Sequence, residues 1–445
     1  MRHFYTFIWY LMLPVIFLRL WLRGRKNPDY RLRWGERLAL GYEKQRSQSE
    51  KLQQNIIWVH SVSVGETLAA VPLIRALEKN YPAHQILVTT TTPTGSERVR
   101  SAFGNSVLHC YLPYDLPAAI KRFLNYYQPE IFIILETELW PNLIRLCYLK
   151  KIPVVLVNAR LSKKSAAGYE RFSSISGPMF QQINKICTQT EKDSKHFARL
   201  LMGQNNSSVR ATNISEKIVT TGNIKFDLEI PGKIVEQGKS LRNKVFPQNA
   251  PVWIAASTHK GEDEKVLSIH AQLLQKCPNA KLIIVPRHQE RFTDVIALCQ
   301  ATPFTIARRT QPDDYQQNAD IFIGDSMGEL LLFYAMSDCA FVGGSLVRRG
   351  GHNLLEAEAF GCPVVVGPYT FNFDEATNLM IAAGAALQTD EGEMSLALLK
   401  WLNDEKARKL AGEAGKKIVL KNKGALNKLL IEITPMITKD AGLHP

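Results

Sequence analysis

The sequence predicts an α/β protein with two doubly wound parallel sheets. Short apolar segments of strand length alternate with helix-length segments, and this rhythm occurs in two separate runs along the chain. The chain has 445 residues, of which 45% are hydrophobic and 22% charged, so it can form two or three domains with cores of their own. We therefore expect two Rossmann-like domains that face a cleft, with an apolar helix in front of them.

An apolar and aromatic segment begins the chain. It covers residues 4–21 and is followed at once by Arg23, Arg25 and Lys26. A spanning helix needs about 20 apolar residues, so this segment could cross a bilayer once or lie embedded in one leaflet. A cleaved signal peptide and a buried core helix are the alternatives. The basic cluster favours a membrane anchor over residues 1–28, with the body of the protein in the cytoplasm.

The first run of apolar segments predicts the first sheet. Strands are expected over residues 55–60, 85–90, 130–135 and 153–158, and the stretches between them are long enough for crossover helices. Parallel strands joined by such helices form a doubly wound sheet. We assign residues 29–228 to this N-terminal Rossmann-like domain.

The same rhythm restarts after a polar segment. Residues 227–245 carry Pro231, Gly232 and mixed charge without a clear apolar period, so we interpret them as the linker region. A second Rossmann-like domain then covers residues 229–445, and its last helix could cross back to the first domain. Its strands are expected over residues 252–256, 281–285, 320–323, 339–343 and 363–366.

Polar residues follow the first expected strand. In open parallel sheets, ligands collect beyond the carboxyl ends of the strands. The stretch from His60 to Glu66 lies there and contains Ser63 and Gly65, which are candidate substrate-binding residues because a glycine lets a ligand approach the backbone. Glu66 is a candidate general base, or a first-turn glutamate that only complements the helix dipole.

Two carboxylates follow the third expected strand. If the chain stays extended there, Glu136 and Glu138 point to the same face and place paired acids at the rim of a binding site. Arg160 follows the next strand and puts a cation in the same neighbourhood. Lys225 comes later in the same domain and could steady anionic charge, although a solvated lysine is the commoner case.

The second half of the chain carries residues that suit a phosphate-bearing ligand. Glycine-rich turns, helix starts and cations follow its strands one after another, which favours a diphosphate or nucleoside phosphate site. Ser326 and Glu329 have capping-box spacing and predict a helix start there. Each such start alone could be explained by capping. The candidate residues for this site are Arg287, His288, Met327, Gly328, Glu329, Asn353, Leu354, Leu355 and Glu356.

Composition and missing motifs exclude several other classes. The seven cysteines are scattered and form no C-x-x-C, so they frame neither disulfides nor a zinc site. The sequence contains no H-E-x-x-H and no D-x-D, and we expect no metal and no cofactor. The formal charge of +14 favours anionic partners. Nucleic acid is disfavoured because the cations are dispersed among the turns that end the strands.

An ordered set of motifs resembles a known family. The chain closely resembles the 3-deoxy-D-manno-octulosonic acid (Kdo) transferases of lipopolysaccharide synthesis from about residue 30 to residue 380. Such an ordered set is far more specific than any single motif. The matching stretches are Trp34 to Arg37, His60 to Glu66, Thr89 to Arg98, Pro113 to Pro117, Glu136 to Asn142, Asn158 to Leu161, Gly222 to Asp227, Ser257 to Glu264, Pro286 to His288, Gly324 to Leu330 and Phe341 to Phe373.

The resemblance implies a GT-B glycosyltransferase and a reaction. CMP-Kdo would donate Kdo, with inversion at the anomeric carbon, to the 6′-hydroxyl of the lipid A precursor, lipid IVA. By this resemblance Glu66 is the general base, and Glu136 and Lys225 stabilise the transition state. The first domain would bind the acceptor, and the candidate residues of the second domain would bind CMP.

The resemblance also implies partners and a location. The acceptor would lie in the cytoplasmic leaflet of the inner membrane of a Gram-negative bacterium, and no nucleic acid would be bound. Two alternatives stay open. One is another membrane-associated GT-B transferase with a different nucleotide sugar, since the fold alone does not fix the donor. The other is a non-catalytic protein that binds anionic lipid.

Overall fold

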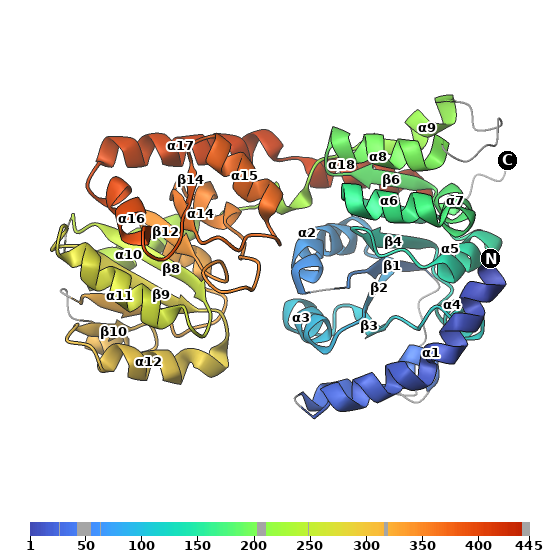
Figure 1. Ribbon diagram of the computed structural model, residues 1–445, viewed down its shortest axis with the longest axis horizontal. Helices are drawn as coiled ribbons and strands as arrows, with labels where there is room; N and C mark the ends of the chain where they lie inside the picture. The colour runs from blue at the N-terminus through green and yellow to red at the C-terminus, as the bar shows by residue number, and fades with distance from the viewer. Residues whose placement is uncertain are drawn as a thin grey trace. The chain divides into compact units, whose positions relative to one another are not determined.

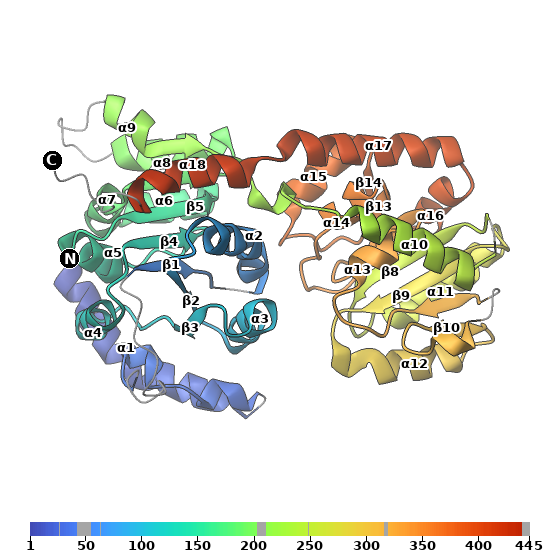
Figure 2. The same ribbon diagram turned by 180° about the vertical axis from the view of Figure 1, so that it is seen from behind.

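Two compact units make up the chain in the computed structural model. The structure describes residues 1–25, 27–41, 55–62, 64–202, 211–247, 249–315 and 319–437. Unit 1 comprises residues 1–227 together with 424–445, and unit 2 comprises residues 228–423. Figures 1 and 2 show the elements of each unit from opposite sides.

The described part of unit 1 is built around a seven-stranded parallel sheet with the strand order β3-β2-β1-β4-β5-β6-β7. The strands are β1 Ile56–His60, β2 Gln85–Thr90, β3 Leu108–Tyr111, β4 Ile131–Leu135, β5 Val154–Ala159, β6 Lys185–Thr188 and β7 Ile218–Thr220. The helices are α1 Arg2–Arg23, α2 Val64–Asn80, α3 Pro93–Phe103, α4 Pro117–Tyr127, α5 Pro141–Leu149, α6 Lys163–Arg171, α7 Ser173–Gln182, α8 Glu191–Met202, α9 Ala211–Lys217 and α18 Ala425–Ile437, with 3-10 turns η1 Pro28–Arg31, η2 Glu36–Leu38 and η4 Ile224–Phe226.

The sheet of unit 1 is covered on both faces. Ile56 and Trp58 of β1 pack into one cluster with residues of α4, α5, α7 and α8. Ile57 and Val59 point the other way, into a cluster with residues of α2, α3 and α18. Every residue of β1 is buried. A strand covered on both faces is apolar throughout, which is why β1, β2, β4 and β5 are recognisable in the sequence.

The predicted strands of unit 1 are confirmed within one residue at each end, and three further strands are present. The additional strands β3, β6 and β7 have only three or four residues each. So short a segment shows no clear periodicity. Whether such a segment joins the sheet depends on its contacts with neighbouring strands and helices rather than on its own sequence.

Unit 2 repeats the architecture, with a seven-stranded parallel sheet in its described residues and the order β10-β11-β9-β8-β12-β13-β14. The strands are β8 Val252–Thr258, β9 Lys281–Pro286, β10 Ile306–Arg308, β11 Ile321–Ile323, β12 Cys339–Val342, β13 Val364–Val366 and β14 Ala386–Gln388. The helices are α10 Gly232–Val245, α11 Asp263–Leu274, α12 Phe292–Gln300, α13 Leu330–Tyr334, α14 Leu355–Ala359, α15 Asp374–Ala382, α16 Met394–Leu402 and α17 Glu405–Asn422, with 3-10 turns η5 Gln289–Arg291 and η6 Pro312–Asp314. The five expected strands are found within two residues, while β10 and β14 were not expected.

The linker interpretation is wrong for residues 232–245, which form helix α10 of unit 2. Gly238 faces Ala335, and a Cβ added at Gly238 would lie only 2.4 Å from the Ala335 side chain. Arg242 forms an ion pair with Asp338 at 2.8 Å. Close packing at a glycine and an ion pair attach this helix to unit 2. Its apolar stripe is therefore too weak for the sequence pattern to reveal the helix.

The last helix, α18, packs into unit 1. Leu429 and Ile433 are fully buried in the same cluster as α2 and α3. The carboxylate of Asp227 accepts hydrogen bonds from the backbone N–H groups of Gly424 and Leu426, the latter at 2.6 Å. These bonds satisfy free donors at the start of the helix. The start of α18 is thereby attached to Asp227.

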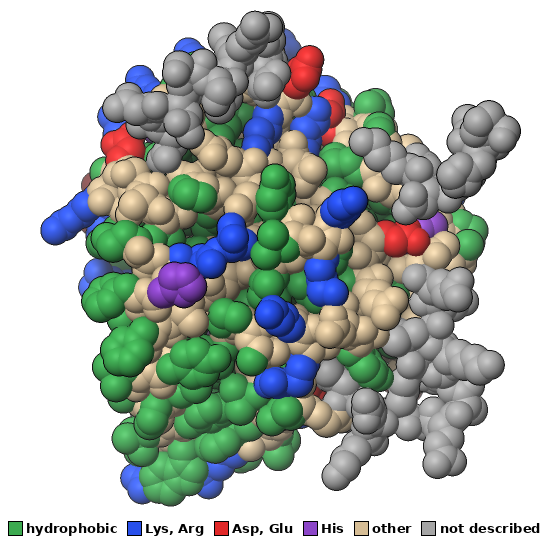
Figure 3. Space-filling model, turned by 90° about the vertical axis from the view of Figure 1, so that its right-hand side faces the viewer, with side chains coloured by type: hydrophobic (Ala, Val, Ile, Leu, Met, Phe, Trp, Pro, Cys, Tyr) green, Lys and Arg blue, Asp and Glu red, His purple; other side chains and the backbone are tan. Residues whose placement is uncertain are grey.

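Helix α1 packs against the rest of unit 1 along one side. Trp9 stacks on Tyr114 with ring centroids 5.7 Å apart, and Phe17 packs against Trp34 at 5.2 Å. Only 6% of the most apolar 18-residue stretch of this helix is buried, so the alternative of a buried core helix is wrong. Figure 3 shows hydrophobic side chains gathered on this face of unit 1. The large exposed apolar residues at this end of the chain are Met1, Phe4, Phe7, Ile8, Tyr10, Leu11, Met12, Val15, Leu18, Trp21 and Leu22.

Candidate active site

Glu66 lies in the first turn of α2, directly after β1. Its Oε2 accepts a hydrogen bond from the backbone N–H of Val62 at 2.8 Å, and the side chain is partly exposed. The backbone bond holds the carboxylate at the carboxyl end of the sheet, where a ligand would bind. Gly65 is exposed in the same turn, whereas Ser63 lies outside the described residues.

Glu136 and Lys225 form an ion pair in unit 1. Lys225 Nζ lies 3.2 Å from Glu136 Oε1, and the two side chains are 20% and 29% exposed, respectively. Glu136 follows β4 with a left-handed φ of 56°, and its N–H donates to Val157 O at 2.9 Å. A left-handed glutamate costs on the order of 1–3 kcal/mol and persists only where its surroundings hold it, typically at functional sites.

Glu138 does not pair with Glu136 as the extended chain would require. Strand β4 ends at Leu135, and residues 136 and 137 form a turn. Burial raises the pKa of Glu138. Burial also raises the pKa of Tyr169, and the nearby charge of Glu138 raises it further. The expectation of two carboxylates on one face is therefore wrong, because the left-handed conformation at Glu136 breaks the alternation of a strand.

Arg160 is exposed at the end of β5. Its backbone carbonyl accepts a hydrogen bond from the hydroxyl of Thr137. The backbone of Arg160 thus helps to hold the turn that carries Glu136.

Three amide side chains near Lys225 were missed by the sequence reasoning. Asn158, Gln189 and Asn223 lie near the carboxyl ends of β5, β6 and β7. The Gln189 side chain donates to the backbone carbonyl of Asn158 and accepts from the side-chain amide of Asn223. Asn158 has a left-handed φ of 52° and no exposed surface. Recognising β6 would have revealed Gln189, since a polar residue directly after a buried strand is the signal used elsewhere in the chain.

In unit 2, Arg287 and His288 follow β9, and two further histidines lie near them. The Nε2 atoms of His259 and His352 are 2.8 Å apart, and the rings of His259 and His288 are 5.5 Å apart. Burial, then the surrounding cations, lower the pKa of His259 to about 4 and that of His352 to about 3. Cations such as Arg287 and Arg349 gather where an anionic ligand would relieve their repulsion. Neither His259 nor His352 was among the candidate residues, although both lie in stretches that match the family.

The 327–329 turn differs in detail from its prediction. Gly328 adopts φ 82°, and Met327 is 46% exposed. Helix α13 begins at Leu330 with Glu329 as its cap residue, and the Ser326 hydroxyl bonds to the Glu329 carboxylate rather than to a backbone N–H. The predicted capping box is therefore wrong. The Arg309 guanidinium donates to the other carboxylate oxygen of Glu329 at 2.7 Å and holds this side chain in place.

Asn353 organises the start of α14. Its Oδ1 accepts from Leu355 N at 3.1 Å, and its Nδ2 donates to Glu356 Oε1 at 3.2 Å. Burial raises the pKa of Glu356, while Asn353 and Arg287 oppose this shift. The side chains of Leu354 and Leu355 are fully buried, so these two residues can meet a ligand only through their backbone.

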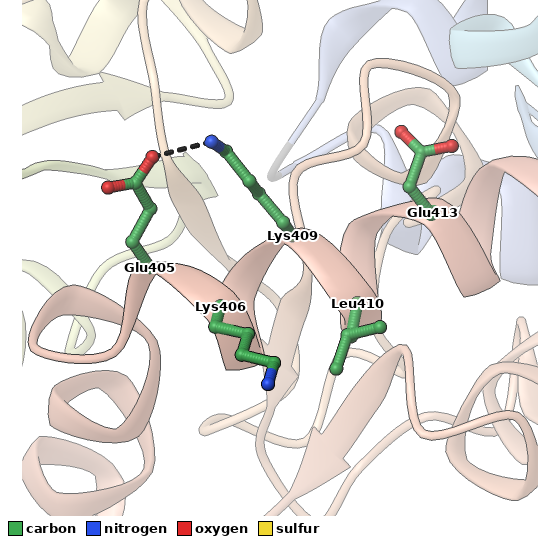
Figure 4. Close-up of a pocket in the computed structure, with 5 residues that line it drawn as sticks. All are labelled: Glu405, Lys406, Lys409, Leu410 and Glu413. Carbon is green, nitrogen blue, oxygen red and sulfur yellow. Dashed lines mark ion pairs between the residues drawn. The ribbon is translucent and has the colours of Figure 1, made fainter.

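Other candidate sites in the described residues are few. No three His, Cys, Asp or Glu side chains among them could hold a metal ion together. A shallow pocket on α17 is lined by Glu405, Lys406, Lys409, Leu410 and Glu413, all from one helix. Figure 4 shows these side chains with the ion pair between Glu405 and Lys409, which measures 2.6 Å. A surface built from one exposed helix has no opposing wall to enclose a ligand.

Comparison with known proteins relates the whole chain to one family. A family model described as 3-deoxy-D-manno-octulosonic-acid transferase (kdotransferase) matches residues 32–228. The 3-deoxy-D-manno-octulosonic acid transferase of Haemophilus influenzae is 42% identical over 441 residues, with 99% of each chain covered. Both findings span the stretches that carry Glu66, Glu136 and Lys225.

Two solved structures each resemble a part of the chain. The C-terminal CMP-Kdo binding domain of WaaA from Acinetobacter baumannii is 34% identical, covers 42% of this chain and 98% of its own, and has a TM-score of 0.40. The UDP-GlcNAc 2-epimerase of Neisseria meningitidis, bound to UDP-GlcNAc, is 15% identical, covers 86% of this chain and 100% of its own, and has a TM-score of 0.54. The latter likeness concerns the fold alone. With the two parallel sheets, it confirms the expected pair of Rossmann-like domains of GT-B type.

Proposed function

Because this chain belongs to the 3-deoxy-D-manno-octulosonic acid (Kdo) transferase family, we propose that its Glu66 removes the proton from the hydroxyl that receives Kdo. The chain is a glycosyltransferase of lipopolysaccharide biosynthesis. In the transfer, the acceptor oxygen bonds to the anomeric carbon of Kdo while the bond from that carbon to the phosphate of CMP breaks. The acceptor proton passes to Glu66, and CMP leaves with the electron pair.

The observation that carries this proposal is the meeting of three charged residues at one sheet edge. Strands β1 and β4 are hydrogen-bonded neighbours, with His60 opposite Ile134. Glu66 follows β1 and Glu136 follows β4, so parallel pairing brings both to the carboxyl edge of the sheet. Lys225 reaches the same edge through its ion pair. A base, a second acid and a cation are what an inverting displacement uses.

Glu136 and Lys225 suit charges that develop during the transfer. The anomeric carbon becomes positive as the bond to the leaving group lengthens, and a carboxylate stabilises that charge. The departing phosphate, or the carboxylate of Kdo, is negative and suits the lysine ammonium group. Their pairing before substrate binds holds both side chains in place.

Unit 2 supplies the donor site in this proposal. Arg287 and His288 follow β9, the 327–329 turn follows β11, and Asn353 follows β12. Strands β11, β9, β8 and β12 are consecutive in the sheet, so these turns share its carboxyl edge. The cations bind the phosphate of CMP-Kdo, and Glu356 binds ribose hydroxyls. The cationic side chains take the place that a metal ion holds in other nucleotide-sugar transferases.

Helix α1 brings the enzyme to the lipid A precursor, lipid IVA. The helix has 22 residues and an exposed apolar side. It contacts the rest of unit 1 from Thr6, which bonds to Asn142, to Phe17, which packs on Trp34. A helix held along the surface of a folded unit cannot also cross a bilayer, so α1 lies in one leaflet. We place that leaflet on the cytoplasmic side of the inner membrane.

The test is transfer to purified lipid IVA by the full-length protein and two variants. Wild type is expected to add Kdo from CMP-Kdo, which mass spectrometry detects as a defined mass increase. Glu66→Ala is expected to lose at least ~100-fold in kcat, the low end for removal of a general base. Glu78→Ala, at the other end of the same helix, is the matched control and should keep wild-type activity.

Three results would contradict the proposal. Transfer from UDP-GlcNAc but not from CMP-Kdo would favour a transferase with a different nucleotide sugar. Full activity of Glu66→Ala would remove Glu66 from the reaction. A protein that binds lipid IVA without adding any sugar would instead favour a non-catalytic lipid binder.

A further inference from the structure

We propose that Gln189 is a positioning residue, which holds the backbone of Lys225 so that its ammonium group stays beside Glu136. The proposal rests on the function proposed above, in which Lys225 and Glu136 stabilise the transition state. Gln189 follows β6, and its side chain is 6% exposed. It contacts neither member of the ion pair in any bond that the structure shows, so it would act through other residues.

The amide of Gln189 makes two bonds in opposite senses. Its Nε2 donates to the backbone carbonyl of Asn158 at 2.9 Å, and its Oε1 accepts from Asn223 Nδ2 at 3.1 Å. A carbonyl oxygen can only accept, so the orientation of the Gln189 amide follows from chemistry. That orientation leaves its oxygen for Asn223, and this in turn fixes the Asn223 amide.

The fixed amide of Asn223 holds the backbone of Lys225 in position. Its Oδ1 accepts from the backbone N–H of Lys225 at 3.0 Å and closes the short turn η4. The adjacent N–H of Ile224 donates to Asn158 Oδ1 at 3.2 Å. Two successive backbone groups of this turn are thus bound to side chains of residues that Gln189 contacts, Asn223 through its amide and Asn158 through its backbone carbonyl.

The other half of the ion pair depends on the same strand. Glu136 N–H donates to the carbonyl of Val157, the residue before Asn158 in β5. Glu136 and Asn158 both adopt left-handed φ values, and the pairing of β5 with β6 shifts register between Leu156 and Ala159. Such strain persists where surrounding bonds over-determine the backbone. Gln189 supplies one of those bonds from the neighbouring strand.

The far end of the Lys225 segment has its own attachment. Asp227 accepts two backbone hydrogen bonds from the start of α18, and Phe226 is buried. With that end fixed, the amide chain through Gln189 decides where the turn sits relative to the sheet. A lateral shift of about 1 Å at a catalytic group can cost roughly 100-fold in rate.

The experiment compares Gln189→Ala, Gln189→Glu, Lys225→Ala and the double variant Gln189→Ala/Lys225→Ala in the full chain. Initial rates with CMP-Kdo and lipid IVA give kcat and both KM values, and thermal melting monitors folding. Gln189→Ala is expected to lower kcat by about 10- to 100-fold, with the KM for CMP-Kdo unchanged within roughly twofold. Gln189→Glu has the same shape and keeps an acceptor for Asn223, but it cannot donate to the carbonyl of Asn158, so it should show a similar loss.

The double variant separates positioning from a general effect on the fold. If Gln189 acts through Lys225, the double variant should be no slower than Lys225→Ala alone, since coupled residues are not additive. If the losses of the two single variants multiply in the double variant, the proposal is overturned, while the role of Lys225 stands. Full activity of Lys225→Ala would overturn the role of Lys225 itself, and any loss in Gln189→Ala could then not pass through it. Gln181→Ala, an exposed change in unit 1, should match wild type throughout.

Discussion

Single buried carboxylates hold several loops of this enzyme in place, and Glu262 is the strongest case. It is fully buried, and its two oxygens accept backbone hydrogen bonds from His259, Gly344 and Leu346 at 2.8–3.0 Å. These amides come from the turns after β8 and β12. Glu262 therefore joins two of the turns that face the proposed donor site.

The variant Glu262→Gln should uncouple these turns. The amide NH2 of glutamine would face at least one backbone N–H, so one buried donor would lose its acceptor at a cost of about 1–3 kcal/mol. We expect a lower melting temperature and weaker CMP binding by calorimetry. The exposed neighbour Glu264→Gln is the control and should change neither quantity. Unchanged CMP affinity in a destabilised Glu262→Gln protein would show that the turns are not coupled to binding.

The sequence predicts the positions of charged residues better than their geometry. Glu66 and Glu136 are recognisable because polar residues follow buried strands, whereas Lys225 stands out only as a cation later in the same domain, and the structure pairs Lys225 with Glu136. The relation between Glu136 and Glu138 was not predictable, since it depends on a left-handed φ at a residue that rarely adopts one. Gln189 was missed because β6 is too short to be recognised.

At the scale of elements, helix α1 combines an apolar composition with specific contacts to the rest of unit 1. Its length and hydropathy were readable from the sequence, but its inner side was not, because aromatic residues occur all around the helix. Trp9, Phe17 and Thr6 face the protein. Phe7 is 62% exposed and belongs to the side that we propose enters the leaflet.

The variant Phe7→Glu should weaken membrane binding without unfolding unit 1. Burial of a phenylalanine side chain contributes about 1.5–3 kcal/mol, so its loss and the added charge should lower partitioning by at least ~10-fold. Sedimentation with vesicles of phosphatidylethanolamine and phosphatidylglycerol measures this. Leu410→Glu, an equally exposed change on α17 at 65%, should partition like wild type. Equal partitioning of Phe7→Glu and wild type would remove this side of α1 from the lipid contact.

Helices α10 and α18 show where local pattern fails and tertiary context decides. The mixed charge of residues 232–245 suggested a linker, yet Gly238 and Arg242 tie this helix to unit 2. The amphipathic pattern of α18 reveals a helix but not which sheet it covers. That choice depends on Asp227, which binds the first backbone N–H groups of α18 from a position almost 200 residues earlier in the chain.

Across the whole molecule, the central strands of both sheets were predictable and the edge strands were not. Strands β1, β4, β8 and β9 are buried on both faces and read as continuous apolar runs. At the margins, β7, β10 and β14 have three residues each and are partly exposed. Most candidate site residues follow strands that were predictable, which is why they could be found in the sequence, whereas Lys225 follows the edge strand β7.

Both units share a dependence on neutral buried histidines. His60 in unit 1 and His270 in unit 2 are fully buried, and burial lowers the pKa of each to about 4. In the unfolded chain a histidine titrates near 6.5. Between about pH 6.5 and pH 4 these histidines bind protons in the unfolded state but not in the folded state. Stability is therefore complete above pH 6.5 and falls as the pH is lowered through this window.

The variant His270→Asn should flatten this acid dependence. At pH 5 each of these two histidines destabilises the folded state by about 2 kcal/mol relative to pH 7. Trp253 donates its ring N–H to His270 Nδ1 at 3.2 Å, and the amide oxygen of asparagine can replace that acceptor without titrating. Urea unfolding at pH 7 and pH 5 should show a smaller loss of unfolding free energy for the variant than for wild type. An equal loss in both proteins would mean that His270 becomes protonated in the folded state, with its charge accommodated beside Trp253.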